Sequence, residues 1–147
     1  MKMSSREYNA YVARLAPKSP LWKDLLNAFW TGGLICVIGQ LIQNGWKAAG
    51  LSKSDAGTAA AISLIFLSAV LTALSLYGKI AKLAGAGTLV PITGFANSVV
   101  SPAMEFRSEG LVTGTAVKMF TIAGPVIVYG TVASVVYGLI YWAMTQL

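Results

Sequence analysis

Four long stretches without a charged residue constrain this chain more than any other feature. Each has 22 residues or more, and they cover Leu25–Trp46, Ala56–Gly78, Leu83–Met104 and Met119–Leu147. About 20 apolar residues in a helix cross the hydrocarbon core of a bilayer, because each residue adds ~1.5 Å. Only 11% of the residues are charged. The pattern predicts an all-α integral membrane protein with three to four transmembrane helices and excludes a soluble enzyme.

Residue types needed for catalysis or metal binding are scarce. Cys36 is the one cysteine and there is no histidine, so zinc and copper sites lack their usual ligands and no disulfide scaffold forms. There is no phosphate loop, nucleophile elbow or dinucleotide fingerprint. Asp24 and Asp55 lie at the edges of apolar stretches, not inside them as an intramembrane aspartyl enzyme would need. We expect no enzyme activity, no cofactor and no metal.

The basic residues outnumber the acidic ones by 11 to 5, and they form no stripe. Instead they flank the apolar stretches, as at Lys23, Lys47, Lys53, Lys79, Lys82 and Lys118. Lysine and arginine favour this position because their charges lie near lipid headgroups. The charge pattern therefore predicts contact with the lipid bilayer and no nucleic-acid binding.

The N-terminal segment, residues 1–23, carries five basic residues against Glu7 alone. By the positive-inside rule this predicts a cytoplasmic N-terminus. Pro17 should end a short amphipathic helix whose apolar stripe is Tyr8, Tyr11, Val12 and Leu15. A helix on the membrane surface and a frayed terminal helix fit this pattern equally. Residues 24–147 then form a single transmembrane domain.

The first two spans have recognisable ends and one unusual face. Ser19 and Pro20 should open the first span, and Ser54 or Asp55 the second, which should end near Gly78 with Tyr77 at the membrane interface. Small or polar residues recur every four positions along the first span, at Ala28, Gly32, Cys36, Gln40 and Asn44. We expect Gly32 and Cys36 to pack on another helix, and Gln40 and Asn44 to do the same or to line a wet path.

The third apolar stretch contains helix breakers. Pro91 removes a helical hydrogen bond, and Gly85, Gly87 and Gly94 weaken the helix around it. Non-helical backbone at membrane depth survives only where protein or a water-filled cavity satisfies it. The pattern favours a broken or re-entrant helix, interrupted near residues 87–93, over a proline-kinked ordinary span. Re-entry would place nine basic residues on the N-terminal side against two opposite, which agrees better with the positive-inside rule than full crossing.

Two further features follow this stretch. Glu105 and Glu109 are four residues apart and would share a helix face, either in a solvated turn or at a pore mouth, and two carboxylates are too few for a calcium cage. Pro125 should open a last helix that ends at Leu147. Small residues spaced by four predict a helix-packing face on it, made of Gly130, Ser134 and Gly138.

The motifs themselves resemble a known family. The run Gly85-Ala-Gly-Thr-Leu-Val-Pro-Ile-Thr-Gly-Phe-Ala-Asn-Ser98 is followed by Glu105, Ser108-Glu-Gly-Leu111, Met119-Phe120 and Ile127-Val-Tyr-Gly130. Together with Gly32-Gly-Leu-Ile-Cys-Val-Ile-Gly-Gln40, this resembles the SpoVAC/SpoVAEB family of stage V sporulation membrane proteins from about Lys18 onward. The order and length of the motifs favour the AC branch over the shorter AEB branch.

The resemblance implies a small protein of the forespore and spore inner membrane in endospore-forming bacteria. Such a protein belongs to an assembly that moves dipicolinic acid, with calcium, into the forespore and releases it in germination. The resemblance also implies stage V sporulation proteins AD, AEA and AEB as partners, and a tension-gated channel activity. A non-conducting membrane scaffold that docks the soluble components is the alternative.

Dipicolinate is a dianion, so its path needs N–H donors and neutral polar contacts without a strong fixed charge. The helix that starts after the break would offer donors and a positive dipole end. We therefore predict a ligand path of Gln40, Asn44, Gly85, Gly87, Pro91, Thr93, Gly94, Phe95, Asn97 and Ser98. The predicted pore mouth is Glu105, Glu109 and Lys118. Asn97 either lines this path or ties its helix to Gln40 or Asn44.

Overall fold

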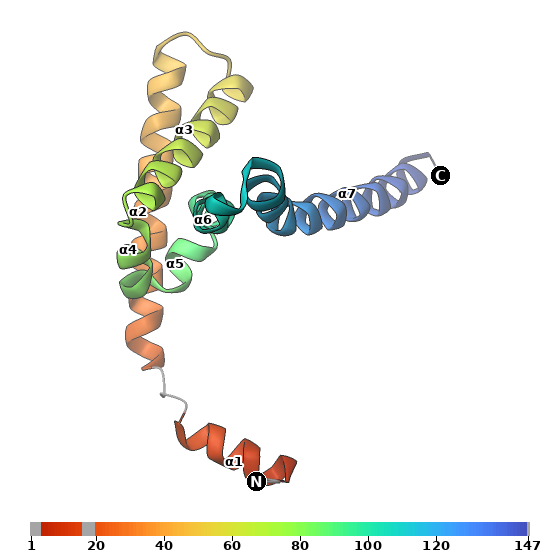
Figure 1. Ribbon diagram of the computed structural model, residues 1–147. Helices are drawn as coiled ribbons and strands as arrows, with labels where there is room; N and C mark the ends of the chain where they lie inside the picture. The colour runs from red at the N-terminus through yellow and green to blue at the C-terminus, as the bar shows by residue number, and fades with distance from the viewer. Residues whose placement is uncertain (1–3, 16–19, 147) are drawn as a thin grey trace.

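The structure is a computed structural model that describes residues 4–15 and 20–146, and every regular element within them is a helix (Figure 1). Three helical segments are long and apolar enough to cross a membrane: Leu21–Ala48, Lys53–Ala73 and Leu111–Gln146. This confirms the predicted all-α membrane fold. Pro17 and Ser19, which were expected to end one helix and cap the next, lie outside the described residues.

Helix α1 spans Ser5–Leu15 and has a capping box at its start. The Ser4 N–H donates to Glu7 Oε2 at 2.9 Å, and the Glu7 N–H donates to Ser4 Oγ at 3.4 Å. The Ser4 hydroxyl also donates to Glu7 Oε2, at 3.0 Å. The bonds from the Ser4 N–H and hydroxyl stabilise the charged carboxylate and lower the pKa of Glu7 below its usual 4.5. The apolar stripe of Tyr8, Tyr11, Val12 and Leu15 is exposed, so a place on the membrane surface stays a prediction.

Helices α2 (Leu21–Ala48) and α3 (Lys53–Ala73) form an antiparallel hairpin (Figure 1). The N-cap of α3 is Ser52, not Ser54 or Asp55 as predicted, because Asp55 is the third helical residue and completes a capping pair with Ser52. The Asp55 N–H donates to Ser52 Oγ at 3.2 Å, and Ser52 Oγ donates to Asp55 Oδ2 at 2.7 Å. Near the same end, Trp46 Nε1 donates to Ser63 Oγ at 3.2 Å and ties the two helices together.

Helix α3 ends at Ala73 rather than near Gly78, so the predicted end of the second span is wrong. The Ser75 N–H donates to the Thr72 carbonyl and the Leu76 N–H to the Leu71 carbonyl, which is the Schellman pattern of a helix end. Ser75 has φ +58° in this turn, a position where glycine is usual. The sequence therefore contains no glycine that would have indicated the end of α3.

The third apolar stretch is broken as predicted. Helix α4 covers Tyr77–Ala84, a single turn α5 covers Ala86–Leu89, and α6 covers Ile92–Glu105. The interruption falls at residues 90 and 91, where Pro91 has an extended backbone with ψ 163°. Helix α6 continues through Pro102.

Two irregular turns join α6 to the last helix. A 3₁₀ turn η1 (Phe106–Glu109) and a π-helical turn η2 (Leu111–Ala116) lead into α7 (Val117–Gln146). Glu105 and Glu109 do not share an α-helical face, because the α-helix ends between them. Helix α7 runs through Pro125, so the predicted helix start there is wrong; a transmembrane helix tolerates the one hydrogen bond that proline removes.

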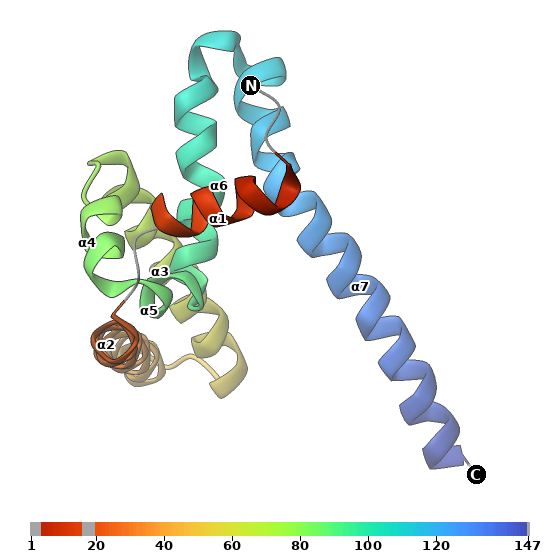
Figure 2. The same cartoon turned by 90° about the horizontal axis from the view of Figure 1, so that it is seen from below.

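The helices α2 to α5 cluster together, α6 packs on α3, and α7 leaves this cluster at a steep angle to α2 (Figures 1 and 2). No residue of α7 is buried. Lipid or another protein therefore has to cover its apolar side chains, since a helix that is apolar all round does not remain in water.

Candidate functional site

The broken segment packs on the small-residue face of α2 through glycine. A Cβ atom built on Gly87 would lie 2.9 Å from Ala28 Cα and would also collide with Thr31 Oγ1 and the Ala28 carbonyl. From the other side, a Cβ on Gly32 would lie 3.4 Å from the Gly87 carbonyl oxygen. The predicted small-residue face is thus where α5 approaches α2, and Gly32 lies directly against Gly87.

The turn from α5 into α6 is equally tight. A Cβ atom on Gly94 would lie 2.8 Å from the Leu89 carbonyl carbon and would collide with the carbonyl oxygens of Thr88 and Leu89. Gly85, which separates α4 from α5, has φ +53°, a region that favours glycine. Two glycines therefore permit the backbone path on either side of α5.

Four buried side chains hold this backbone in place, and we call them the break clamp: Ser68, Tyr77, Thr88 and Thr93. The Tyr77 hydroxyl donates to the Thr88 carbonyl at 2.9 Å, and its oxygen lies 3.2 Å from Thr93 Oγ1. Ser68 Oγ donates to the Thr93 carbonyl at 2.6 Å. Thr88 Oγ1 donates to the Gly85 carbonyl at 3.1 Å. These bonds meet the need of non-helical backbone for polar partners at membrane depth.

Sequence analysis missed Tyr77 and Ser68 as members of this site. Tyr77 was expected at the membrane interface, but it is only 4% exposed and opens α4 beside the break. A serine inside an apolar helix usually bonds to its own helix backbone, but the Ser68 hydroxyl reaches across to α6. The available signal was a tyrosine inside an uncharged stretch, because a buried tyrosine hydroxyl needs a hydrogen-bond partner.

Asn97 is tied to α3. The Thr72 hydroxyl lies 2.9 Å from Asn97 Oδ1 and 2.7 Å from the Ser68 carbonyl oxygen, so its one hydrogen is shared between a bond to α6 and a bond to its own helix. The expected partners are different: Gln40 Nε2 donates to Asn44 Oδ1 at 2.9 Å, and both side chains are exposed on α2. The tie that sequence analysis considered for Asn97 therefore exists, but it runs to Thr72.

The predicted path residues are not gathered in one place. Gly87, Thr93 and Gly94 are buried and build the break itself. Gly85 and Phe95 are exposed, and Pro91, Asn97 and Ser98 are half-buried, with Ser98 Oγ donating to the Phe95 carbonyl at 2.8 Å. Gln40 and Asn44 lie farther along α2. Contact of any of these residues with a ligand stays a prediction.

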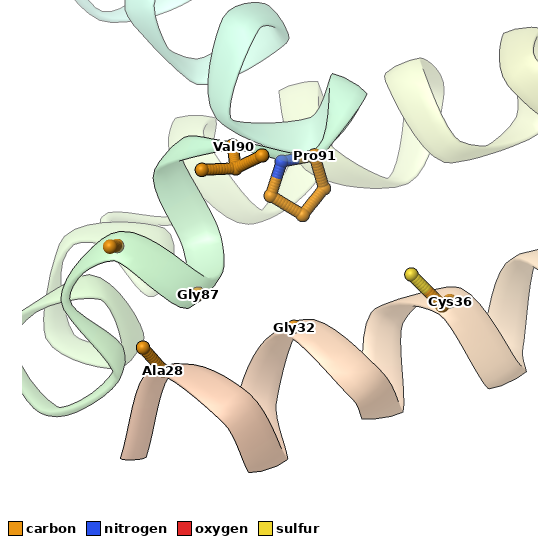
Figure 3. Close-up of a pocket in the computed structure, with 7 residues that line it drawn as sticks. Ala28, Gly32, Cys36, Gly87, Val90 and Pro91 are labelled. Atoms are coloured by element: carbon orange, nitrogen blue, oxygen red, sulfur yellow. The ribbon is translucent and has the colours of Figure 1, made fainter. Parts of the chain in front are cut away.

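A cleft of about 300 Å³ lies between α2 and the broken segment (Figure 3). We call it the α2 cleft, and its lining is Ala28, Gly32, Cys36, Ala86, Gly87, Val90 and Pro91. The Cys36 sulfur points from α2 toward the side of the cleft that Pro91 forms (Figure 3). The lining carries no charged side chain, so the cleft suits a neutral guest better than a bare ion.

The predicted pore mouth lies where α6 meets α7. Glu105 and Glu109 are exposed, and Lys118 Nζ lies 3.8 Å from the centre of the Phe106 ring, a cation–π contact. A Cβ on Gly114 would lie 3.0 Å from Glu109 Cβ, so η1 and η2 pack closely. Within residues 4–15 and 20–146, no group of three or more His, Cys, Asp or Glu side chains could hold a metal ion.

The predicted packing face of α7 has no neighbour within the chain. A Cβ atom on Gly130 or on Gly138 would meet no other atom within 4 Å. Ser134 Oγ donates to the Gly130 carbonyl at 2.8 Å. The face is therefore open to lipid or to another protein.

Comparison with known proteins assigns the chain. The family described as SpoVAC/SpoVAEB sporulation membrane protein matches residues 24–140. The chain belongs to this family. The protein named "Stage V sporulation protein AC" from Bacillus subtilis (strain 168) is 45% identical over 141 residues, which cover 95% of this chain and 94% of that protein. No solved structure matches the chain. The match to the family includes most of α2, the break clamp and most of α7, and it places the chain in a membrane.

Proposed function

We propose that this chain is a pore or transport subunit that moves dipicolinic acid, with calcium, across the inner membrane of the forespore and spore. Membership of a sporulation membrane family supports the setting. The observation that carries the proposal is the helix broken at Val90 and Pro91 and held by the break clamp. Broken helices of this kind form substrate and ion sites in transporters, because their half-helix ends present unpaired backbone groups and helix dipoles.

The lining of the α2 cleft favours one form of the substrate. The free dianion would have to give up its hydration among apolar side chains, which is costly for an unpaired charge. Calcium neutralises dipicolinate when the two form a complex. The neutral complex is therefore the form we propose for passage beside the break, with the first turn of α6 supplying N–H donors.

An assembly is part of this proposal. One chain with three helices long enough to span the membrane provides few helices to enclose a pore, and no residue of α7 is buried within the chain. We propose stage V sporulation protein AEB as the membrane partner, and proteins AD and AEA as soluble partners on the cytoplasmic side, where the basic N-terminus lies. Gating by membrane tension would act by moving α5 and α6 relative to α2.

Cys36 provides a direct test, because it is the one cysteine in the chain and lines the α2 cleft. The chain is reconstituted in liposomes with protein AEB, and calcium dipicolinate efflux is measured before and after reaction with a bulky maleimide. We expect modification of Cys36 to block efflux and Cys36→Ser to remove this sensitivity. The matched control is Val37→Cys in the Cys36→Ser background, since Val37 lies at the same depth outside the cleft. Unchanged efflux after complete modification of Cys36 would overturn the proposed path.

The alternative is a membrane scaffold that docks the soluble components and conducts nothing. The scatter of the predicted polar path residues over α2, the break and α6 favours it. Liposomes that hold this chain and protein AEB, bind protein AD and yet leak no dipicolinate under any tension would establish the scaffold.

A further inference from the structure

A second cavity lies on the opposite side of the break, between α2, α3 and α4. Its volume is about 220 Å³. The walls are aliphatic and come from all three helices: Leu34, Ile38, Leu64, Leu67, Leu71 and Ile80. All four members of the break clamp also line it. We call it the clamp cavity.

The hydroxyl groups that line the clamp cavity already have hydrogen-bond partners within the chain. Tyr77 and Ser68 donate to backbone carbonyls of Thr88 and Thr93, and Thr88 donates to Gly85. Among the residues that the structure describes, no buried side-chain nitrogen or oxygen lacks a partner. An enclosed apolar cavity of ~150 Å³ binds apolar molecules such as benzene, and the mainly aliphatic walls of the clamp cavity favour the same kind of guest.

The depth of the cavity determines which apolar molecules surround it. Leu34 and Ile38 lie near the middle of α2, and Leu64 lies near the middle of α3. Both helices are long and apolar enough to span the bilayer, so their middles lie in the hydrocarbon core. Leu34, Leu67 and Ile80 are 61%, 46% and 44% exposed and form the open side. Lipid chains are the apolar molecules at this depth.

We propose that the clamp cavity is a binding site for one acyl chain of a membrane lipid. The chain enters from the hydrocarbon core between Leu34 and Leu67, and its end packs against Tyr77 and Ser68. The side chains that hold the break therefore also form the floor of the lipid site. Occupancy and the geometry of the break are linked for this reason, whether or not the chain itself conducts dipicolinate.

The test uses the full chain in liposomes of phosphatidylcholine that carries a diazirine near the end of one acyl chain. After irradiation, mass spectrometry locates the lipid adducts. We expect adducts on Ile35 and Leu64, which are half-buried and line the cavity. Leu71→Trp fills the cavity and should lower these adducts by about tenfold, the factor that corresponds to ~1.4 kcal/mol of binding. Phe66→Trp is the control, because Phe66 is exposed on α3 and does not line the cavity.

A second variant fills the cavity without changing α3, and so separates loss of the lipid site from misfolding of α3. Ile80→Phe fills the same cavity from α4 and should lower the same adducts, while adducts on α7 stay constant in every variant. Adducts at Ile35 and Leu64 that persist in both filling variants would overturn the proposal. Cross-links from these residues to a second protein chain, in place of lipid, would overturn it as well.

Discussion

The Tyr77 hydroxyl on α4 donates to the Thr88 carbonyl on α5 at 2.9 Å, eleven residues later in the chain. Because α5 ends at Leu89 and α6 begins only at Ile92, the Thr88 carbonyl lies outside a continuous helix and lacks the backbone N–H that would otherwise bond to it. The Tyr77 hydroxyl takes the place of that N–H. The same hydroxyl lies beside Thr93 on α6. One side chain thus fixes both sides of the break.

Tyr77→Phe should destabilise the chain. It leaves the ring in place but removes the donor to Thr88, and an unsatisfied buried carbonyl costs about 1–3 kcal/mol. Thermal unfolding in detergent measures the change, and amide hydrogen exchange should rise first in residues 86–94. Tyr137→Phe serves as the control, because Tyr137 is 70% exposed on α7. Equal unfolding midpoints for Tyr77→Phe and the natural chain would show that the hydroxyl does not hold the break.

Gly87→Ala and Gly33→Ala should have opposite effects. The added methyl group on Gly87 would collide with Ala28 and Thr31, and such overpacking costs about 1–3 kcal/mol. Gly33 lies on α2 with nothing within 4 Å of its Cβ position, so alanine there should add up to ~1 kcal/mol through helix propensity. Unfolding midpoints in the same detergent compare the two. A destabilised Gly33→Ala variant would contradict the assignment of the two faces.

Sequence analysis predicted the parts of this fold that depend on local chemistry. Runs without charge indicated the spans, and Gly85, Gly87, Pro91 and Gly94 indicated the break, because each acts on its own backbone. The end of α3 escaped, since Ser75 occupies the left-handed position where glycine would have marked the stop. The helix start predicted at Pro125 was wrong, because the hydrogen bond that proline removes costs less free energy than the apolar helix on both sides of it supplies.

The partners of the polar side chains were harder to predict. Asn97 needed a hydrogen bond, and its position in an apolar run showed that need. Which residue supplies the bond depends on how α3 and α6 cross, and only the packing of the two helices brings Thr72 to it. The break clamp was missed for the same reason, since Ser68 and Thr93 are 25 residues apart.

The carboxylate of Glu7 should titrate below its usual pKa in the folded chain. The Ser4 N–H and hydroxyl donate to the charged form, so this stabilisation of α1 is complete above the unfolded pKa and disappears as the pH falls through the folded one. An NMR titration of Glu7 in detergent micelles measures it. Ser4→Ala should raise the Glu7 pKa toward 4.5. Identical titration curves for Ser4→Ala and the natural chain would contradict the capping box.

Bulk on the open face of α7 should affect assembly and not folding. Gly130→Leu and Gly138→Leu add side chains where the chain has no neighbour within 4 Å, so each variant should insert and unfold like the natural chain. Close approach of another helix would be blocked, because small residues permit it. Co-purification with protein AEB measures this, and Val135→Leu on the same helix is the control. Normal recovery of both glycine variants would mean that this face contacts lipid.

Asn97 and Thr72 allow the two roles of Asn97 to be separated. If Asn97 only ties α6 to α3, Thr72→Val and Asn97→Leu both remove the Thr72–Asn97 bond, and Thr72→Val also removes the bond from the Thr72 hydroxyl to the Ser68 carbonyl. The double variant should then cost no more than Thr72→Val alone, with a coupling of about 0.5–1.5 kcal/mol in unfolding free energy. Dipicolinate uptake by liposomes should fall equally in both single variants.

If Asn97 also lines the path, uptake falls further in Asn97→Leu than in Thr72→Val, and Asn97→Ser retains more uptake because a polar group remains. We expect this second result, because Asn97 is half-buried and keeps an amide nitrogen free of the Thr72 bond. Equal uptake in Asn97→Leu and Thr72→Val would restrict Asn97 to the structural tie.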